Sequence, residues 1–476
     1  MHKQKHTVAI SEKINEGLKE FLIRHDRQED LAFALWTPSI GENRLTALLH
    51  AIVFPQKGDR QIHGNASFNP AYFDRVCKLA LQEKCGIAFL HSHPFPGWQG
   101  MSDDDIIAER KMAGATHAIT DLPLLGMTVG SDGIWSGRFW KYSGNRQYNR
   151  VWCHSVRVVG KSLKVNFNKL LEPETVNREY IKRTVSVWGE KDHIDLIRLR
   201  IGIIGLGSVG SMIAETLSRM GMKRFTLIDF DEIQAHNLDR LLGATTEDIG
   251  MLKVAMVDRQ IKRSTTATNV DVNTVPFSLA EKEGYKAALD CDVLFSCVDR
   301  PRARHILNHF AYAHLIPVID GGIDVRFNKK REFTGVDWQL QTVAPGRPCL
   351  KCIGAYDIND VSLEENGLLE DPSYMKNLPD NHHLKRNENV FPFSANLASL
   401  ETVQFVALVI GAGGISDFGI QRYRYWPGTI DVDIEKRCSA ECDCEKFVGQ
   451  GDRYFSLIGR DLNAESARKR QLEFIN

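Results

Sequence analysis

The sequence predicts a two-domain α/β protein in which each domain is built around its own sheet. The chain has 476 residues, enough for two or three domains at about 150 residues each. Residues 86–90 form a compact apolar run, typical of a buried strand, that leads directly into a histidine-rich turn. A second apolar run at 201–204 leads into a glycine-rich turn and an amphipathic segment, which indicates a βαβ unit.

These patterns set the predicted boundaries. We expect an N-terminal domain over residues 1–150, a helical connector over 151–195, a Rossmann-like domain with a mostly parallel sheet over 196–450, and a C-terminal tail over 451–476.

Shorter signals place further elements inside the two domains. In the first, residues 31–36 and 45–54 are typical of strands, and 126–135 of a closing hairpin. Asn69 followed by Pro70 predicts a helix start, because asparagine is a favoured N-cap and proline fits the first helical position. In the second domain, residues 292–297 and 316–319 predict further parallel strands.

Composition and charge narrow the function classes. The chain is 43% apolar and 25% charged, which excludes wholesale disorder, and 60 basic residues balance 60 acidic ones. Nucleic-acid binding through bulk positive charge is therefore not expected. No secretory leader is visible at the start, and the apolar run 405–415, interrupted by glycines, is shorter than the ~18 residues of a membrane span. We expect a soluble cytoplasmic protein.

The first chemical motif follows the strand at 86–90. His91 and His93 stand two residues apart around Ser92, and Asp105 lies in the first turn of the next predicted helix. Two imidazoles and a carboxylate leave a fourth position open for water, which is typical of catalytic rather than structural zinc. The alternative is a pair of surface histidines beside an acidic helix start.

This spacing, H-S-H-P-x7-S-x2-D, resembles the JAMM/MPN+ metalloprotease family over roughly residues 10–145. The resemblance implies an α/β metalloprotease domain whose Zn²⁺ is held by His91, His93 and Asp105. It implies that Ser102 stabilises the oxyanion and that an upstream glutamate acts as the base. Glu29 fits that position, and Glu42 is the weaker rival. The family cleaves amide or isopeptide bonds after ubiquitin-like C-termini.

The second motif is the glycine turn with Gly205, Gly207 and Gly210 between a strand and a helix. Such a turn lets a phosphate-bearing nucleotide approach backbone N–H groups at a helix N-terminus. Asp229 stands where a dinucleotide enzyme places its ribose-binding carboxylate, so an NAD-dependent oxidoreductase is an alternative.

The run that begins at Asp229, DFDEIQAHNLDRLLG and then GMLKVAMV, resembles the ThiF/MoeB/ubiquitin-activating adenylyltransferase superfamily. The resemblance covers about residues 178–445 and implies use of ATP and Mg²⁺. It implies that Asp229 binds the ribose, with Asp231 in the same nucleotide site, and that the triphosphate is bound by Asn237, Arg240 and Lys253.

Two flanking segments extend this resemblance. Asp299 matches an aspartate near the attacking carboxylate and Mg²⁺, and Arg183 matches an arginine that reaches the ATP of the partner subunit in a homodimer. The sequence departs from the pattern at Leu241, where the superfamily has glutamine, and at Arg300, where it has asparagine.

Five of the ten cysteines cluster near the C-terminus at spacings typical of metal ligands. Cys349 and Cys352 form a CxxC pair, and Cys438, Cys442 and Cys444 lie some ninety residues further on. We predict a structural Zn(Cys)₄ site from the first pair with Cys442 and Cys444, leaving Cys438 as the rival ligand. Relatives that form a thioester carry a cysteine between these pairs, and this sequence has none there.

Together these motifs predict a bifunctional enzyme. One domain would cleave a ubiquitin-like protein by maturation or deconjugation, and the other would adenylate its C-terminal carboxylate. Two settings stay open: a bacterial conjugation pathway, with antiviral defence as one use and a conjugating enzyme as a further partner, or processing of a sulfur carrier. The sequence leaves the partner's identity undetermined.

Overall fold

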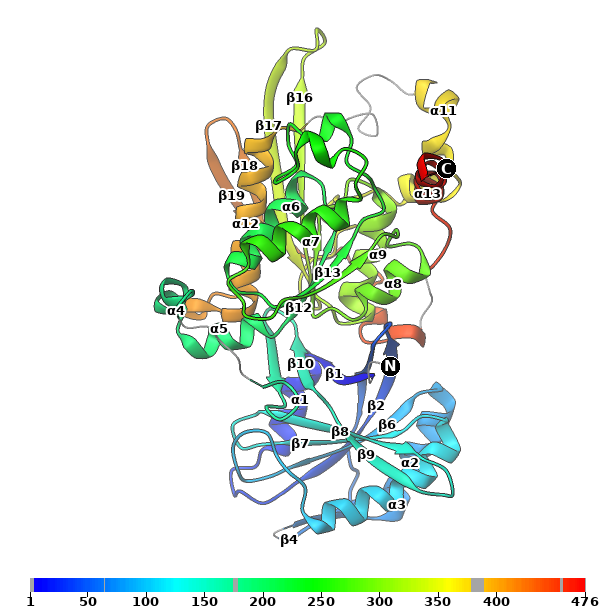
Figure 1. The fold of residues 1–476 in the computed structure, drawn as a ribbon. Coiled ribbons are helices and arrows are strands. Elements are labelled where there is room, and N and C mark those ends of the chain that lie inside the picture. Colours follow the sequence, from blue (N-terminus) through cyan, green and yellow to red (C-terminus); the bar gives the residue numbers. More distant parts are fainter. Residues whose placement is uncertain (1–3, 64, 174–178, 378–388, 454–456, 476) are drawn as a thin grey trace. The chain divides into compact units, whose positions relative to one another are not determined.

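The computed structural model describes residues 4–63, 65–173, 179–377, 389–453 and 457–475 (Figure 1). The chain forms two compact units. The first comprises residues 1–174 with the short segments 312–315 and 445–455, and the second comprises the remainder. Each unit has its own large sheet.

The sheet of the first unit has nine strands in the order β11-β10-β1-β3-β2-β6-β7-β8-β9. Pairs β1–β10, β1–β3 and β6–β7 are parallel, and the others are antiparallel. The strands are β1 (Lys5–Ser11), β2 (Leu31–Ile40), β3 (Arg44–Val53), β6 (Gly86–Ser92), β7 (Leu124–Val129), β8 (Trp135–Tyr142), β9 (Tyr148–Trp152), β10 (Ser155–Val159) and β11 (Leu163–Phe167); β4 (Arg60–His63) and β5 (Asn65–Phe68) form a separate hairpin.

Three helices cover this sheet on its two faces. Helix α1 (Glu12–Leu22) packs on one face, and α2 (Pro70–Glu83) and α3 (Asp103–Thr120) pack on the other. Strand β2 shows the alternation: Ala34 and Trp36 join the cluster with α1, and Phe33 and Leu35 join the cluster with α2. The strand is therefore buried on both faces, which explains its continuous apolar sequence.

The predicted helix start at Asn69 is confirmed in this unit, whereas part of the predicted helical connector is wrong. Asn69 accepts a hydrogen bond from the backbone of Ala71 and caps α2, as predicted. The predicted helical connector over 151–195 is wrong in its first part, because β10 and β11 continue the first sheet. Its helices are α4 (Lys182–Trp188) and α5 (Glu190–Ile197), and residues 174–178 lie outside the described residues.

The second unit has an eight-stranded sheet in the order β14-β13-β12-β15-β16-β17-β18-β19, parallel from β14 to β16 and antiparallel beyond. The strands are β12 (Arg200–Ile204), β13 (Arg224–Ile228), β14 (Asp271–Val275), β15 (Val293–Ser296), β16 (Val318–Phe327), β17 (Phe333–Val343), β18 (Ile420–Arg424) and β19 (Thr429–Asp433). Chain order reverses between β12 and β15. Nucleotides bind at the carboxyl ends of strands at such a switch point.

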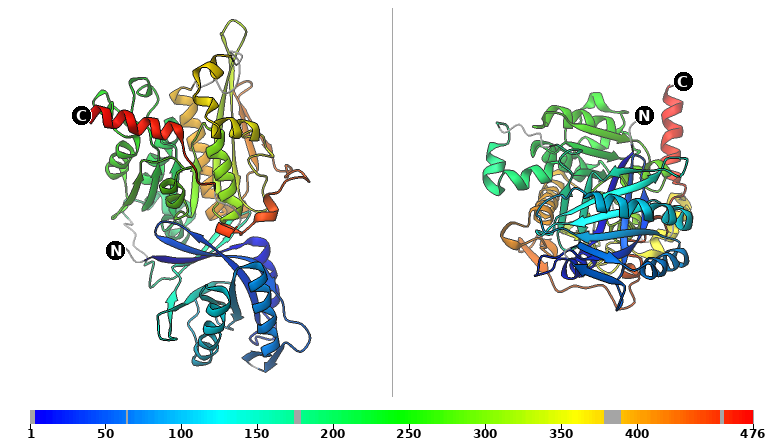
Figure 2. Two further views of the ribbon diagram at one scale, coloured as in Figure 1. Left: turned by 90° about the vertical axis from the view of Figure 1, so that its right-hand side faces the viewer. Right: turned by 90° about the horizontal axis from the view of Figure 1, so that it is seen from below.

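Helices flank this sheet on both sides (Figure 2). They are α6 (Ser208–Arg219), α7 (Lys253–Ser264), α8 (Lys282–Ala288), α9 (Pro301–Ala313), α10 (Ile358–Glu365), α11 (Pro372–Asn377), α12 (Phe391–Ile410) and α13 (Leu462–Ile475). Among the described residues, α12 is the one helix long and apolar enough to cross a membrane. It packs on α6, β16 and β17 with half of its apolar window buried, as a core helix does.

Candidate functional site

The predicted metal ligands come together in the first unit at the carboxyl end of β6. His91 is buried near the end of that strand, His93 is the first residue after the strand, and Asp105 lies in the first turn of α3. Their ligand atoms lie within 4.8 Å of one another. The local pattern therefore sets the geometry: one strand end and one helix start supply all three side chains.

The distances within this group fit a small cation. The two histidine Nε2 atoms are 3.1 Å apart, and they lie 3.2 Å and 3.4 Å from the Asp105 oxygens. A tetrahedral zinc ion with bonds near 2.0–2.1 Å places neighbouring ligand atoms about 3.3 Å apart. The side chains present therefore fit a bound Zn²⁺ at three of its four positions.

The start of α3 holds the carboxylate in place. Ser102 caps the helix: its Oγ accepts from the Asp105 backbone N–H, and Asp105 Oδ2 accepts from the Ser102 N–H at 2.8 Å. Burial alone would raise the pKa of Asp105, but hydrogen bonds from His91 and His93 hold it well below its usual value. Asp105 thus takes part in the capping box and is also the predicted metal ligand.

Glu29 lies beside this group. It precedes β2, and its Oε1 is 3.8 Å from His93 Nε2. Burial raises the pKa of Glu29, while the neighbouring His93 and His91 oppose that rise. This placement suits a proton acceptor next to a metal-bound water. The rival Glu42 is exposed in the turn between β2 and β3.

The structure adds a buried ion pair that the sequence did not suggest. Arg138 on β8 bonds to Glu109 on α3, with 3.0 Å between Nε and Oε2, and both side chains are fully buried. Arg138 also donates to Thr128 Oγ1 at 2.6 Å, and that hydroxyl is 3.3 Å from His91 Nε2. The pair thus connects α3 and β8 with the first histidine.

In the second unit the glycine turn lies at the switch point of the sheet. Gly205 has φ +86°, and a Cβ there would press on the carbonyl of Cys297 at the end of β15. A Cβ on Gly210 would overlap the Gly205 carbonyl, whereas one on Gly207 would meet open space. Gly207 caps α6 without a side-chain hydrogen bond, so the backbone N–H groups of the first turn stay available to a phosphate.

The acidic residues and the lysine of the predicted nucleotide site lie together. Asp229 accepts from the Leu206 N–H of the glycine turn at 2.7 Å. Lys253 Nζ is 2.7 Å from Asp231 and 4.0 Å from Asp229. Burial alone would lower the pKa of Lys253, but these carboxylates, with Asp299 as a smaller contribution, raise it. The lysine therefore remains a cation at the end of β13.

The remaining predicted residues make local contacts. Asn237 Oδ1 accepts from the Gln234 N–H at 3.0 Å, and Arg240 Nη1 donates to the His236 carbonyl at 2.6 Å. Arg183 is exposed on α4. Of the two departures, Leu241 is buried in the core, and Arg300 pairs with Glu370 at 3.1 Å.

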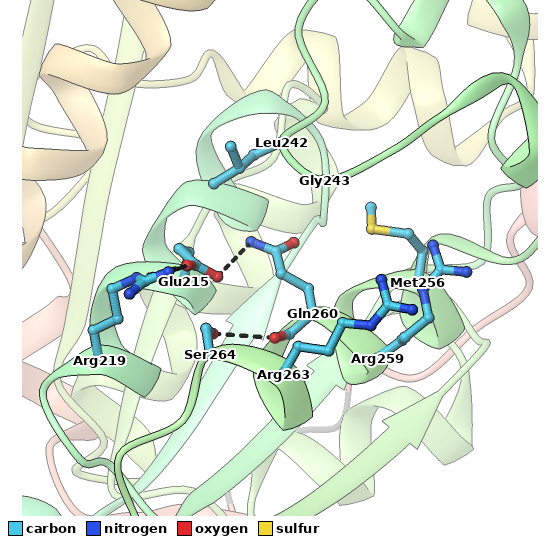
Figure 3. Close-up of a pocket in the computed structure, with 9 residues that line it drawn as sticks. All are labelled: Glu215, Arg219, Leu242, Gly243, Met256, Arg259, Gln260, Arg263 and Ser264. Atoms are coloured by element: carbon cyan, nitrogen blue, oxygen red, sulfur yellow. Dashed lines mark hydrogen bonds and ion pairs between the residues drawn. The ribbon is translucent and has the colours of Figure 1, made fainter. Parts of the chain in front are cut away.

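A pocket of about 260 Å³ lies between α6 and α7 (Figure 3). Its lining includes Arg219, Arg259 and Gln260, and none of the predicted nucleotide residues. Leu242 and Gly243 form its rim two residues beyond Arg240. It lies beside the predicted nucleotide site rather than in it.

The cysteine group differs from the prediction in one member. The four sulfurs within 4.8 Å of one another belong to Cys349, Cys352, Cys438 and Cys442. The Cys349–Cys442 separation is 3.7 Å, close to the ~3.8 Å edge expected for a tetrahedron with Zn–S bonds of 2.3 Å. Cys444, predicted as the fourth ligand, is buried and accepts from Asn308 Nδ2 at 3.5 Å. Cys438 takes its place in the group.

Backbone N–H groups support thiolates here. The Cys349 N–H donates to Cys438 Sγ at 3.2 Å, and the Ser439 N–H donates to Cys352 Sγ at 3.4 Å. Burial would raise the pKa of Cys352, but its hydrogen bonds with Ser439 lower it to about 7. The donor set fits a structural zinc ion.

The order of β12 to β16, the glycine turn and the carboxylate after β13 define a Rossmann-type nucleotide-binding domain. More specifically, residues 181–412 match the ThiF family model, so the chain contains a ThiF family domain. This match begins at residue 181, so the candidate metal group of the first unit rests on the geometry of its own side chains.

Curated relatives match part of the chain. The Drosophila willistoni ubiquitin-like modifier-activating enzyme 5 is 24% identical over 195 residues, covering 37% of this chain and 45% of that protein. Molybdopterin-synthase adenylyltransferase of Escherichia coli is 26% identical, covering 40% and 73%. The E. coli tRNA threonylcarbamoyladenosine dehydratase is 29% identical, covering 30% and 54%. The chain spans about half the length of two of these relatives: 45% of the ubiquitin-like modifier-activating enzyme 5 and 54% of the tRNA threonylcarbamoyladenosine dehydratase.

A crystal structure of E. coli MccB with ATP shows 16% identity and a TM-score of 0.43, covering 57% of this chain and 75% of that one.

Proposed function

We propose that the chain carries two activities on one substrate. The ThiF family domain adenylates the C-terminal carboxylate of a ubiquitin-like or sulfur-carrier protein, and the N-terminal unit is a zinc peptidase that cleaves after the same tail. The adenylation half is supported by the family match and by relatives whose names include a ubiquitin-like modifier-activating enzyme and an adenylyltransferase.

One observation carries the adenylation half. Lys253 is held as a cation beside Asp229 and Asp231, and Asp229 is bonded to the glycine turn at the switch point. Attack of a carboxylate oxygen on the α-phosphorus of ATP breaks the α–β phosphoanhydride bond and releases pyrophosphate. Both reactants are anions, so the site must neutralise charge. Lys253 and Arg240 supply the positive charge that this requires. The α6 N-terminus binds phosphate oxygens, and Asp299 would hold Mg²⁺.

The peptidase half rests on the convergence of two imidazoles and a carboxylate with a fourth position open. Zinc, when bound, would polarise the scissile carbonyl and acidify a water molecule. Glu29 is the side chain that would accept a proton from the attacking water and deliver it to the departing amine. Ser102 is placed at the helix start beside the ligands, where its hydroxyl proton can meet a developing oxyanion.

Two further observations support the proposals of a homodimer and of a direct transfer of the adenylate. Arg183 is exposed on α4, so it is available to reach the nucleotide of a second copy in a homodimer. The chain lacks a cysteine between Cys352 and Cys438, so the adenylate would pass directly to a partner's thiol, a sulfur donor or an amine. Protein conjugation, including in antiviral defence, and sulfur transfer remain the two settings for this product.

Two variants separate the halves. The full chain is incubated with ubiquitin-like and sulfur-carrier proteins, and ATP–pyrophosphate exchange and the intact mass of each partner are measured. Lys253→Ala should reduce exchange by about 100-fold or more and leave trimming unchanged. Glu29→Gln should do the opposite, with trimming reduced by about 10²–10⁴. Exchange that needs no carrier, or binding of NAD in place of ATP, would refute the adenylation half; trimming that survives in Glu29→Gln would refute the peptidase half.

A further inference from the structure

A second cavity of about 260 Å³ opens beside the candidate metal group. His93 and Pro94 form one wall, and Arg24 and Arg27 lie on the loop between α1 and β2. The cavity has room for about one amino-acid side chain rather than a folded domain. Whatever occupies it therefore lies close to the bond that the metal group would cleave.

The two arginines differ in how they are paired. Arg24 donates to Asp26 at 2.9 Å through Nε and lies 3.5 Å from Asp30, so carboxylates of the chain already neutralise it. Arg27 is exposed, and its guanidinium has no ion pair or hydrogen bond with any part of the chain that the structure describes. One uncompensated cation therefore faces the cavity.

The backbone conformation of Arg27 is shared with other turns. Its φ is +59°, a left-handed conformation that six other non-glycine residues of the described chain also adopt. What distinguishes Arg27 is its unpaired guanidinium at a cavity that His93 also lines.

Hydrogen bonds hold the loop that continues from the wall of His93 and Pro94. Gln99 Nε2 donates to the carbonyls of Phe95, Pro96 and Gly97, and the Gly97 N–H donates to Asp132 at 2.9 Å. The wall that lies across from the arginine loop is therefore supported by a fixed segment of the chain.

We propose that this cavity is a subsite for a carboxylate of the substrate, bound by Arg27 next to the scissile bond. This proposal rests on the peptidase half of the proposed function. A carboxylate and a guanidinium form paired, charge-assisted hydrogen bonds, which a neutral side chain cannot match. The carboxylate has two possible sources: the C-terminus of a short tail that is being removed, or an acidic side chain near the bond.

Binding to a cleavage-deficient protein tests the subsite without relying on turnover. The zinc-loaded full chain with Glu29→Gln is titrated with four labelled peptides that share a Gly-Gly pair. Two differ only in a free or amidated C-terminus, and two, both amidated, carry aspartate or asparagine beside the glycines. We expect at least one carboxylate peptide to bind about tenfold more tightly than its neutral match, with the preference falling at high salt. The pair that shows the preference identifies the source.

Arg146 provides the matched control, because it is also exposed and has the same φ of +59° in another turn of this unit. Arg27→Ala should abolish the preference for the carboxylate peptides, whereas Arg146→Ala should keep both that preference and the affinity for neutral peptides. Equal affinities for all four peptides, or no binding by any, overturns the subsite. Cleavage of the peptides by the protein with Glu29 intact is a separate readout: a preference without cleavage refutes the peptidase and leaves the subsite standing.

Discussion

Replacing Cys438 by serine is expected to weaken zinc binding by the second unit, whereas replacing Cys444 is expected to leave the zinc affinity unchanged. Cys438 belongs to the group whose sulfurs lie within 4.8 Å of one another, and Cys444 instead accepts from Asn308. Structural zinc sites are worth about 10–16 kcal/mol over four ligands, so one thiolate contributes about 3 kcal/mol. Since about 1.4 kcal/mol is a factor of ten, Cys438→Ser should weaken zinc binding about 100-fold.

The assay is competition against a chromophoric chelator, with zinc per chain determined by elemental analysis after dialysis. The full chain carries His91→Ala in every sample, so that the ion of the first unit is removed and only the cysteine group is counted. This background and its Cys444→Ser derivative should each hold one zinc with the same affinity, and its Cys438→Ser derivative should lose its zinc to the chelator at an affinity about 100-fold lower. Zinc lost from Cys444→Ser but kept by Cys438→Ser would refute the assignment made from the structure.

The remaining predictions concern packing and pH. Gly210→Ala should abolish ATP binding measured by calorimetry and lower the melting temperature, because its Cβ would overlap the Gly205 carbonyl, whereas Gly207→Ala, whose Cβ would occupy the open space that a phosphate approaches, should weaken ATP binding without lowering the melting temperature; equal melting temperatures would contradict this account of the turn. Glu109→Gln should lower the free energy of unfolding of the first unit by about 3–5 kcal/mol in urea, because it leaves Arg138 buried without its partner, and adding Arg138→Met should recover most of the loss; a loss below about 1 kcal/mol would count against the pair. Burial raises the pKa of Glu364 from 4.5 to about 7, so the folded state holds this proton more tightly. The resulting stability is present below pH 4.5 and is lost as pH rises through about 7, and Glu364→Gln should flatten this decline in the melting temperature.

The candidate metal group of the first unit could be predicted from sequence because its geometry is local. His91 and His93 lie at a strand end, and Asp105 lies at the third position of the next helix, so two short elements fix all three. The capping box that orients Asp105 is itself encoded by Ser102 and Asp105. The spacing of these residues in the sequence is therefore nearly sufficient to predict that their side chains come together.

The cysteine group and the buried ion pair depend on tertiary contacts that spacing does not encode. Cys444 is closer in sequence to Cys442 than Cys438 is, yet the path of the chain after β19 places Cys438, not Cys444, next to the backbone N–H of Cys349. Arg138 lies in a strand and Glu109 lies in a helix. In both kinds of element a charged side chain normally faces water. Their burial follows from α3 packing across β8, with Gly126 leaving room for the carboxylate.

The position of the cysteine group indicates what a structural ion would do for the predicted nucleotide site. Cys349 and Cys438 are 89 residues apart, and the segment between them contains α12 and the β18–β19 hairpin. Closing a loop of that length restricts the unfolded chain by about 4–5 kcal/mol in the chain-entropy model. Helix α12 packs on α6, whose first turn follows Gly207. An ion bound by these cysteines would therefore stabilise the helix that packs against α6, without contacting the residues predicted to bind ATP.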